Sequence, residues 1–490
     1  MAEGITPRDS DYSQWYLDVI AQGELADYAP VKGCIVFRPH GFAIWDLMKN
    51  DLDRRFRETG HVNAYFPLLI PVSFLSKEAE HVEGFAKECA VVTHHRLRVA
   101  EGGGVEPDPA SKLEEPLVIR PTSETIIWHM YGQWIQSWRD LPILINQWAN
   151  VVRWEMKTRP FLRTAEFLWQ EGHTAHATRD EAVEETLRML NVYADFAREV
   201  MAMPVIQGVK STSERFAGAE DTYCIEALMQ NGWALQAGTS HFLGQNFAKA
   251  FDVTFQSPGG EREHVWATSW GVSTRMIGAV IMTHSDDTGL VLPPALAPIQ
   301  VVITPIWKTD AEKALVLAHA ARIQAALSPV LRVKLDDRDT IKPGAKYFEW
   351  ERKGVPLRLE IGPRDVAGDS VFAAPRTGGK KFGIPAATVL EGVQGALHAI
   401  QTLLFDRAVA RREETMRRPA DYAGFKADLE KGGFIEVFWH DDAVAEAKIK
   451  EETRATVRCF PLAGQSAAVG QICFYSGRPA THVALFARAY

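Results

Sequence analysis

Residues 150–176, NVVRWEMKTRPFLRTAEFLWQEGHTAH, gather arginines, glutamates and aromatic side chains on what reads as two strands joined by a short turn. Side chains alternate between the two faces of a strand, so Arg153 and Glu155 are expected to share one face of the first strand. The second strand is expected to place four further side chains on one face: Phe167, Trp169, Glu171 and His173.

These residue types suit a nucleotide. Arginine binds phosphate through two parallel hydrogen bonds, an aromatic ring stacks on a base, and a glutamate accepts a hydrogen bond from an exocyclic amine. The turn adds Lys157, Arg159 and Arg163. The alternative is a salt-bridged sheet face beside aromatic core residues, which Arg153 and Glu155 alone would favour. Several charges on one strand pair favour a site, because buried ion pairs are weak stabilisers.

The sequence contains no convincing match to the known glycine-rich phosphate-binding motifs. The stretch TGGKK at 377–381 resembles a Walker A loop, but it lacks the first glycine at the required spacing and the Ser or Thr after the lysine. No GxGxxG follows a predicted strand. His173 and His176 have i, i+3 spacing, yet no third ligand is evident, so no metal site is predicted there.

Composition limits the class of protein. The chain has 490 residues, a formal net charge of −8 and five scattered cysteines, which favours reduced thiols in a cytoplasmic protein. The first residues form no signal peptide, and no stretch approaches the roughly 20 apolar residues of a membrane span. We therefore expect no membrane partner, and any nucleic-acid surface must be local.

The first part of the chain, residues 1–292, is expected to be an α+β domain with an antiparallel sheet. The pattern predicts a helix over 42–58 and a strand over 65–71. A strand at 117–125 precedes a Trp-rich helix, and a mobile Gly/Pro-rich loop covers 99–110. The sequence T-R-D-E from Thr178 predicts a capping box that begins another helix. Strands with glycines over 233–275 lead into an apolar helix.

The pattern changes after the proline-rich linker at 292–300. Strands and helices then alternate, with Thr309 and Glu312 capping the first helix, which predicts a small α/β domain over 297–404. A charged helix at 405–418 leads into a small α+β module over 405–490.

Four segments carry a resemblance that covers essentially the whole chain. RPTSET (120–125), the hairpin (150–176), QAGTSHFLGQNF (236–247) and TSWGVSTR (268–275) resemble class II prolyl-tRNA synthetases. YFPLLIP (65–71) is similar to motif 1 of that family, which builds its dimer interface. The hairpin resembles motif 2, and WGVSTR resembles motif 3. The resemblance implies a class II synthetase catalytic domain, an anticodon-binding domain and a homodimer.

The resemblance also implies site residues for ATP. Arg153 would hold the α-phosphate, Glu155 the adenine amine, and Phe167 the adenine ring. Arg275 would lie on the other face of adenine or on the γ-phosphate, and Mg²⁺ would bridge the triphosphate. The remaining ATP contacts would come from Arg163, Gln236 and Thr239. Arg153 and Arg275 would be the catalytic residues.

Proline is the second implied substrate. Thr122 and Glu124 would hold its imino group, and the rest of its pocket would comprise Arg153, Trp169, Glu171, His173, His241 and Ser273. The physics agrees, because a carboxylate must pair a charged secondary ammonium and a flat aromatic covers an apolar ring. The proline carboxylate then attacks the α-phosphorus in line, and the prolyl-adenylate esterifies the tRNA. This chemistry needs positioning and charge neutralisation more than a protein base.

Each residue also has a structural alternative. Thr122 and Glu124 could cap the following helix, Trp169 alone is more often a core residue, and His241 alone is more often a hydrogen-bonded core histidine. Only their joint, ordered occurrence favours the site. Other class II synthetases, for threonine, serine, glycine or histidine, and a non-catalytic tRNA-binding paralogue are the alternative functions.

Residues 297–404 resemble the anticodon-binding domain of class IIa synthetases. From Arg332 to Lys381 there are 12 Lys or Arg against 8 Asp or Glu, and a basic patch suits a tRNA backbone. Glu351, Arg358 and Arg364 are the candidates for reading the anticodon of tRNA(Pro), by edge hydrogen bonds and stacking. A solvated charged face is the alternative for each.

The C-terminal module departs from its relatives, which often carry zinc with C-x4-C and C-x2-C spacing. Here the four positions hold His440, Ala445, Cys473 and Ser476. At most two of these side chains, His440 and Cys473, are plausible ligands. Structural zinc is bound by four ligands, so no zinc is predicted. We expect the final Tyr490 to return towards the catalytic domain. Only about 90 residues separate Glu171 from Arg262, which leaves no room for the editing insertion of many bacterial relatives.

Overall fold

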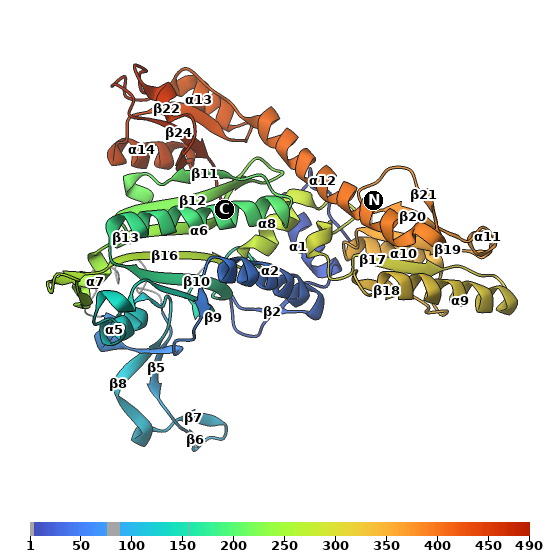
Figure 1. Ribbon diagram of the computed structural model, residues 1–490, viewed down its shortest axis with the longest axis horizontal. Coiled ribbons are helices and arrows are strands. Elements are labelled where there is room, and N and C mark those ends of the chain that lie inside the picture. The colour runs from blue at the N-terminus through green and yellow to red at the C-terminus, as the bar shows by residue number, and fades with distance from the viewer. Residues whose placement is uncertain (1–3, 76–88, 156) are drawn as a thin grey trace.

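A computed structural model describes residues 4–75, 89–155 and 157–490 (Figure 1). Its centre is a ten-stranded sheet with the strand order β22-β24-β23-β11-β12-β13-β16-β10-β9-β3. In that order the strands span Ile435–Trp439, His482–Ala487, Thr456–Pro461, Ile206–Val209, Asp221–Leu228, Ala234–Gly244, Trp266–Ser273, Glu166–His176, Ile143–Val152 and Val62–Asn63. Most neighbours are antiparallel, as predicted, and only β3 and β9 pair in parallel.

The predicted hairpin exists as β9 and β10, but its first strand is shorter than predicted. β9 ends at Val152, so Arg153 and Glu155 lie beyond it, and strand alternation does not place them. Pairing persists for one more step, because the Arg153 amide donates to the Ala165 carbonyl over 2.8 Å. Arg153 therefore stays beside β10.

Helices cover one face of this sheet and surround its edge. α6 (Arg179–Glu199) begins with the predicted capping box of Thr178 and Glu181 and packs on β12, β13 and β16. α2 (Pro39–Glu58) contains the helix predicted over 42–58 and buries Ile44, Met48, Leu52 and Phe56. α1 (Tyr12–Gln22) and α8 (Arg275–His284) join the same core. Small elements complete this part: β1 (Ala26–Tyr28), β2 (Ile35–Phe37), α7 (Asn246–Ala250), β14 (Thr254–Gln256) and β15 (Arg262–His264).

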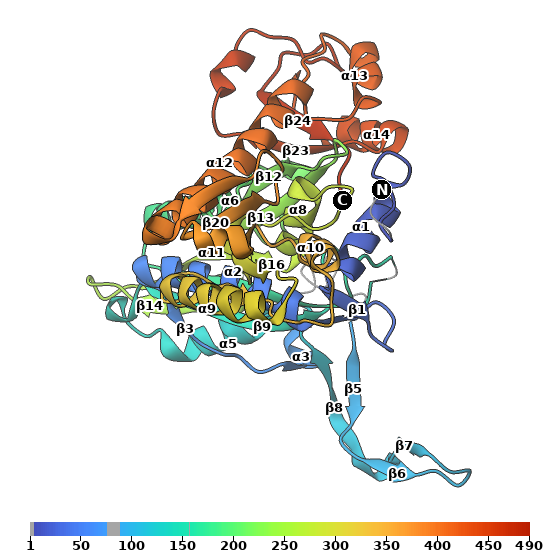
Figure 2. The same cartoon turned by 90° about the vertical axis from the view of Figure 1, so that its right-hand side faces the viewer.

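A narrow arm projects from the body (Figure 2). Its base is a three-stranded sheet of β4 (Leu69–Pro71), β8 (Lys112–Ile119) and β5 (Val91–His94), next to α3 (Val72–Leu75) and α5 (Glu124–Trp134). Its tip is the hairpin β6 (Leu97–Val99) and β7 (Val105–Pro107), so the loop predicted over 99–110 contains a strand. Of the strand predicted over 65–71, only β4 forms, because Pro67 has no amide hydrogen for a ladder.

The α/β part has a five-stranded sheet of order β18-β17-β19-β20-β21. β17 (Val301–Pro305) pairs in parallel with both β18 (Val333–Leu335) and β19 (Leu357–Ile361). β20 (Ser370–Pro375) then pairs antiparallel with β19, and β21 (Phe382–Pro385) pairs antiparallel with β20. Its helices are α9 (Asp310–Leu327), capped as predicted by Thr309 and Glu312, α10 (Pro343–Arg352) and α11 (Pro363–Ala367). The charged helix predicted over 405–418 is the second part of α12, a single helix that spans Val389–Thr415.

The C-terminal part extends the central sheet. α13 (Tyr422–Leu429) and α14 (Ala443–Thr453) accompany β22, β23 and β24. β23 pairs with β11 through Gly208↔Pro461 and Val209↔Phe460. Three strands from the end of the chain therefore continue the sheet that begins near residue 62, which a sequence pattern could not indicate.

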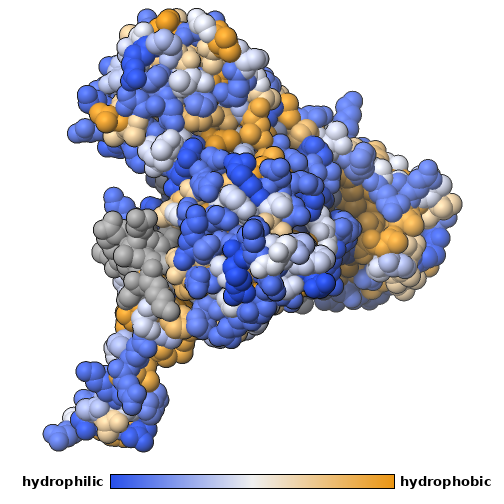
Figure 3. All heavy atoms as spheres, turned by 60° about the vertical axis from the view of Figure 1, so that its left-hand side comes forward, coloured by the Kyte–Doolittle hydropathy of each residue, from blue (hydrophilic) through white to orange (hydrophobic). Residues whose placement is uncertain are grey.

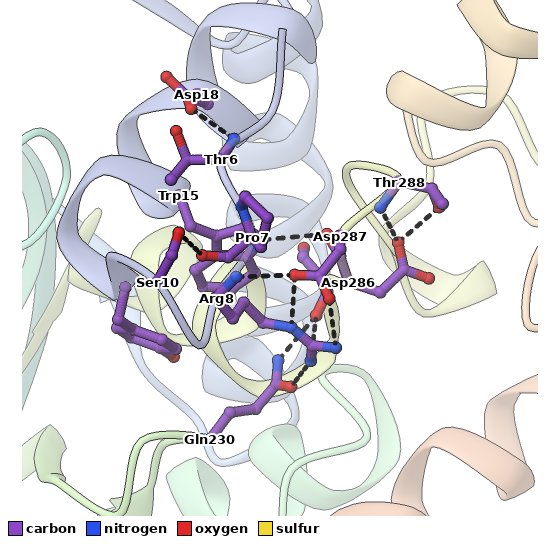
Figure 4. A network of polar contacts seen from close by, with 12 residues as sticks. Thr6, Pro7, Arg8, Ser10, Trp15, Asp18, Gln230, Asp286, Asp287 and Thr288 are labelled. Atoms are coloured by element: carbon purple, nitrogen blue, oxygen red, sulfur yellow. Dashed lines mark hydrogen bonds and ion pairs between the residues drawn. The ribbon is translucent and has the colours of Figure 1, made fainter. Parts of the chain in front are cut away.

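Two ion pairs hold the N-terminal segment and the α/β part to the turn after α8. The Arg8 guanidinium donates to both carboxylate oxygens of Asp287, and it also donates to Gln230 (Figure 4). Arg376 of the α/β part donates two hydrogen bonds, 2.8 and 2.7 Å long, to the neighbouring Asp286. Within the described ranges, no helix is long and apolar enough to cross a membrane.

Candidate functional site

Three adjacent strands, β10, β16 and β13, turn one face towards a cavity of about 340 Å³, within the range of small-ligand sites. Register explains the lining, because Trp169 lies opposite Ser273, and His173 opposite Ser269, which in turn faces His241. All predicted ATP and proline residues except Glu155 and Arg163 line this cavity: Thr122, Glu124, Arg153, Phe167, Trp169, Glu171, His173, Gln236, Thr239, His241, Ser273 and Arg275.

The predicted shared face of β10 is therefore correct. Residues 167, 169, 171 and 173 all reach the cavity. The intervening Gln170 points the other way, where its amide oxygen accepts a hydrogen bond from Tyr193 of α6 over 2.5 Å. Alternation along one strand thus separates the cavity wall from the helix-packed core.

Positive charge gathers at one end of the cavity. The Arg153 guanidinium lies 5.5 Å from the ring centroids of both Phe167 and Trp169, and its Nε donates to the Pro121 carbonyl over 2.9 Å. Burial and, after it, the charges of Arg163 and Arg153 lower the pKa of Arg275 to about 10. Neighbouring cations that destabilise one another in this way favour an anion between them.

Arg163 and Glu155 lie just outside the described lining. Their side chains form an ion pair of 3.2 Å, and Arg163 is 60% exposed whereas Glu155 is 30% exposed. This pair is the salt-bridged alternative considered from the sequence. The charge of Arg163 acts on Arg275 and that of Glu155 acts on Arg153, so both groups lie near the arginines of the lining.

A buried carboxylate, Glu124, lies close to Arg153, because burial lowers the pKa of Arg153 and the charge of Glu124 opposes that fall. Glu124 is 3% exposed, and the Thr122 hydroxyl donates a short hydrogen bond to its Oε2. The helix-capping alternative for these residues is not realised, because the N-cap of α5 is Ser123, which makes no side-chain capping bond. Thr122 instead orients a buried carboxylate that faces the cavity.

Glu171 is the centre of a buried network. Its Oε1 accepts hydrogen bonds from Ser123 Oγ at 2.5 Å and Gln147 Nε2 at 2.7 Å, while His173 Nε2 lies 2.9 Å from Oε2. Burial opposes protonation of His173, but Glu171 outweighs it, so the pKa of the imidazole is raised. Glu171 is thus occupied by its neighbours and orients His173.

Some polar atoms of the lining lack a described hydrogen-bond partner although they are buried. They are Trp169 Nε1, His173 Nδ1 and Ser269 Oγ. Buried polar groups are nearly always satisfied, so each of these atoms indicates a ligand or water in the cavity. The site can thus hold an anion beside an aromatic pair, next to a carboxylate that suits a small cation.

Sequence reasoning missed several lining residues. Ser269 lies inside the quoted TSWGVSTR stretch, and its i, i+2, i+4 spacing with Gly271 and Ser273 could have revealed it. The segment Glu214, Arg215 and Phe216 also lines the cavity. It follows a 3₁₀ turn and carries no periodic signal, so only the fold brings it there.

The three candidates for anticodon contact do not form one cluster. Arg358 on β19 donates to Glu351 over 3.0 Å, and its guanidinium lies 3.9 Å from the Tyr347 ring centroid. Arg358 also pairs with Glu360 at 3.1 Å. Arg364 is exposed on α11, beyond the far end of β19. Glu351 and Arg358 therefore act together, and Arg364 is a separate surface charge.

The chain end returns to the first part of the protein. The Tyr490 amide donates to the Ala234 carbonyl over 3.2 Å, and Asn231 bonds its hydroxyl at 2.8 Å. The guanidinium of Arg159, from the turn between β9 and β10, lies 5.4 Å from the Tyr490 ring centroid and 5.2 Å from that of Tyr16. Burial raises the pKa of Tyr490 to about 12.

Sequence comparison divides the chain among three family models. Residues 105–284 match the tRNA synthetase class II core domain (G, H, P, S and T). Residues 300–395 match an anticodon-binding domain, and residues 422–490 match the C-terminal domain of prolyl-tRNA synthetases.

Whole-chain relatives carry one name, proline–tRNA ligase. The protein of Flavobacterium johnsoniae is 56% identical over 494 residues, covering 100% of both chains. Those of Bacteroides fragilis and Porphyromonas gingivalis are 57% and 58% identical and cover 99% of both chains. Among solved structures, the prolyl-tRNA synthetase of Cryptosporidium parvum, complexed with halofuginone and AMPPNP, matches with a TM-score of 0.91, 38% identity and 99% coverage of both chains.

Proposed function

This chain belongs to the class II prolyl-tRNA synthetases, and we propose that the cavity between β10, β16 and β13 is where it joins L-proline to ATP. The reaction follows from the family: proline is activated to prolyl-adenylate with release of diphosphate, and the prolyl group passes to tRNA(Pro) with release of AMP. The assignment of individual residues to these steps is the proposal.

The arginine-rich part of the cavity is proposed to bind ATP. Arg153 and Arg275 contact the phosphates and stabilise the charge that develops at the α-phosphorus. Phe167 supports the adenine ring, and Glu155 accepts a hydrogen bond from the adenine amine. Arg163, Gln236 and Thr239 supply the remaining contacts. Mg²⁺ bound with ATP beside Arg153 and Arg275 would neutralise part of the phosphate charge.

The part of the cavity around Glu124 is proposed to bind proline. Glu124, oriented by Thr122, pairs with the secondary ammonium, and Trp169 covers the pyrrolidine ring. His173 is held by Glu171, and with His241 and Ser273 it closes the pocket. Arg153, close to Glu124, attracts the proline carboxylate towards the phosphate. Bound in this way, the carboxylate oxygen is aligned for attack, which lowers the barrier.

The observation that carries this proposal is the convergence of residues from four separate sequence segments on one cavity, which brings two arginines close to a buried carboxylate. Threonine, serine and glycine have no ring for Trp169 to cover, and these three and histidine are primary amines rather than a secondary ammonium. A tRNA-binding paralogue without activity would usually lack Arg153 or Arg275.

Exchange of labelled pyrophosphate into ATP separates these functions. We expect the purified chain to catalyse exchange with proline and not with threonine, serine, glycine or histidine. Exchange that depends on one of these four amino acids would reassign the pocket, and no exchange with any amino acid would favour the paralogue.

tRNA(Pro) is proposed to lie along residues 297–404 and to extend to the catalytic part, 1–292. Glu351 and Arg358 would read anticodon bases as a pair, and Arg364 would contact the backbone. Several cations of this basic stretch are already paired, such as Lys381 with Glu360 at 2.7 Å. The free cations therefore decide how steeply tRNA binding falls with salt.

A homodimer is proposed to form through the segment that resembles motif 1 and the arm beside it. Apolar side chains are exposed there: Val62 (62%), Tyr65 (68%), Leu69 (39%) and Val91 (51%). Figure 3 shows hydrophobic surface where the arm leaves the body. Such a patch marks an interface. A mass of one protomer in sedimentation equilibrium would contradict the proposed homodimer.

The proposed location of the protein is the cytoplasm.

The C-terminal module, 405–490, is proposed to hold no zinc. Ala445 and Ser476 stand at two of the four expected ligand positions, and His440 Nδ1 already bonds the Pro479 carbonyl at 2.8 Å. In the described ranges, no three His, Cys, Asp or Glu side chains gather as a metal site. The side chains at the four positions therefore cannot supply the four ligands that structural zinc needs. Stoichiometric zinc in the purified protein would refute this proposal.

Alanine is expected to be mischarged. A pocket that rejects a substrate only by its missing methylenes discriminates by roughly 10–200-fold, and no editing insertion lies between Glu171 and Arg262. We expect alanine-dependent pyrophosphate exchange at that reduced efficiency, and no acceleration of the hydrolysis of preformed Ala-tRNA(Pro). Rapid deacylation of Ala-tRNA(Pro) by this chain alone would contradict the prediction.

A further inference from the structure

Residues 210–216 connect β11 to the cavity. The end of this segment forms part of the wall, because Glu214, Arg215 and Phe216 line the cavity. The Phe216 ring stacks on His241 with centroids 4.5 Å apart and planes at 30°, and its amide donates to Thr222 Oγ1 over 3.0 Å. The segment therefore fixes the position of His241, a proposed contact of proline.

The start of the same segment is held by the C-terminal module. Ser211 Oγ donates to Glu446 Oε1 over 3.1 Å, and Ser213 Oγ donates a short hydrogen bond to the other carboxylate oxygen. Thr212 donates to Asp441 over 3.0 Å, and Lys450 pairs with Glu214 at 3.2 Å. Four consecutive residues of the segment are thus bound from outside the catalytic part.

Glu446 is the buried member of these contacts. It lies in the first turn of α14 and is 3% exposed, whereas Lys450 and Glu214 are 58% and 31% exposed. Burial raises the pKa of Glu446, and the hydrogen bonds from Ser213 and Ser211 oppose that rise. A buried carboxylate depends on such donors, so the segment and Glu446 hold each other. Figures 1 and 2 both show the C-terminal module beside β11 and β12.

We propose that Glu446 is a positioning residue for proline: it acts through residues 210–216 to set the wall formed by Phe216 and His241. This inference rests on the proposed function of the cavity. Loss of the carboxylate frees Ser211 and Ser213, and a wall displaced by about 1 Å binds and aligns its ligand poorly. Arg153 and Arg275 are on other elements and keep their places, so the effect falls on proline rather than on ATP.

The test is a set of substitutions on α14 with pyrophosphate exchange as the readout. We expect Glu446→Ala to raise the KM for proline about tenfold while the KM for ATP changes less than about twofold. Glu446→Gln retains one carbonyl acceptor, so a rise of about threefold is expected. Glu451→Ala removes an exposed carboxylate from the same helix and is expected to match the parent chain.

Ser213→Ala provides a second route should Glu446→Ala not fold, because it removes the same hydrogen bond from the segment. The double variant Ser213→Ala/Glu446→Ala should then raise the KM for proline by less than the product of the single effects. A folded Glu446→Ala or Ser213→Ala with the parental KM for proline, or with equal rises for proline and ATP, overturns the inference. Absence of proline-dependent exchange in the parent chain would instead refute the proposed function.

Discussion

Arg153→Ala is expected to lower kcat/KM for proline-dependent pyrophosphate exchange by at least about 10³-fold, a loss of roughly 4 kcal/mol of transition-state stabilisation. Arg153 lies beside both Phe167 and Trp169 and close to Glu124 of the proposed proline pocket. From this position it can contact both the attacking carboxylate and the α-phosphate. Its removal leaves the charge that develops at the α-phosphorus to Arg275, Arg163 and the Mg²⁺ that accompanies ATP.

The fall should appear mainly in kcat, because the interaction strengthens as charge develops. Arg153→Lys keeps the charge but not the planar pair of donors, so a loss of about 10²-fold is expected. Arg163→Ala removes an exposed cation and should lower kcat/KM by about tenfold. Arg57→Ala is the surface control, since its side chain is 70% exposed on α2. Exchange by Arg153→Ala within tenfold of the parent would contradict both the site and the mechanism.

Local patterns in the sequence predicted the parts of this site that depend on one strand. The period of two in residues 167–173 correctly placed four side chains on one face of β10. The Thr178 and Thr309 capping boxes correctly marked two helix starts. Such features are decided by neighbouring residues, so they can be read before the fold is known.

The parts that were missed depend on tertiary contacts. The end of β9 at Val152 is set by the turn that follows, and the helix over 389–415 continues because no local stop interrupts it. The polar partners of Glu171 come from 24 and 48 residues away in the chain. Residues 214–216 reach the cavity at the end of a segment that the C-terminal module holds through Asp441, Glu446 and Lys450. No spacing rule connects positions so distant.

Glu226→Gln is expected to lower the free energy of local unfolding at the paired strands β11 and β23 by about 3–5 kcal/mol. This is the usual cost of removing one partner from a buried ion pair. Glu226 is fully buried, and its carboxylate binds Lys210 Nζ at 2.9 Å and Arg458 through hydrogen bonds of 3.0 Å. The glutamine leaves two buried cations unpaired. Native-state hydrogen exchange of the β11 and β23 amides measures the change without assuming two-state unfolding.

The pH dependence of that difference separates lost charge from lost packing. Burial raises the pKa of Glu226, but Arg458 and Lys210 outweigh it, so its folded-state pKa is lowered. Its contribution is therefore fully present above the unfolded pKa of about 4.3 and disappears as the pH falls through the lower folded value. The difference between the parent chain and Glu226→Gln in this free energy of local unfolding should stay constant from about pH 5 to 8. It should become smaller at acidic pH. Replacing all three charges together, as Lys210→Met/Glu226→Leu/Arg458→Met, should recover most of the loss, because matched apolar groups need no counter-charge. A difference independent of pH, or a triple variant as unstable as Glu226→Gln, would show that packing rather than charge holds the C-terminal module to the catalytic sheet.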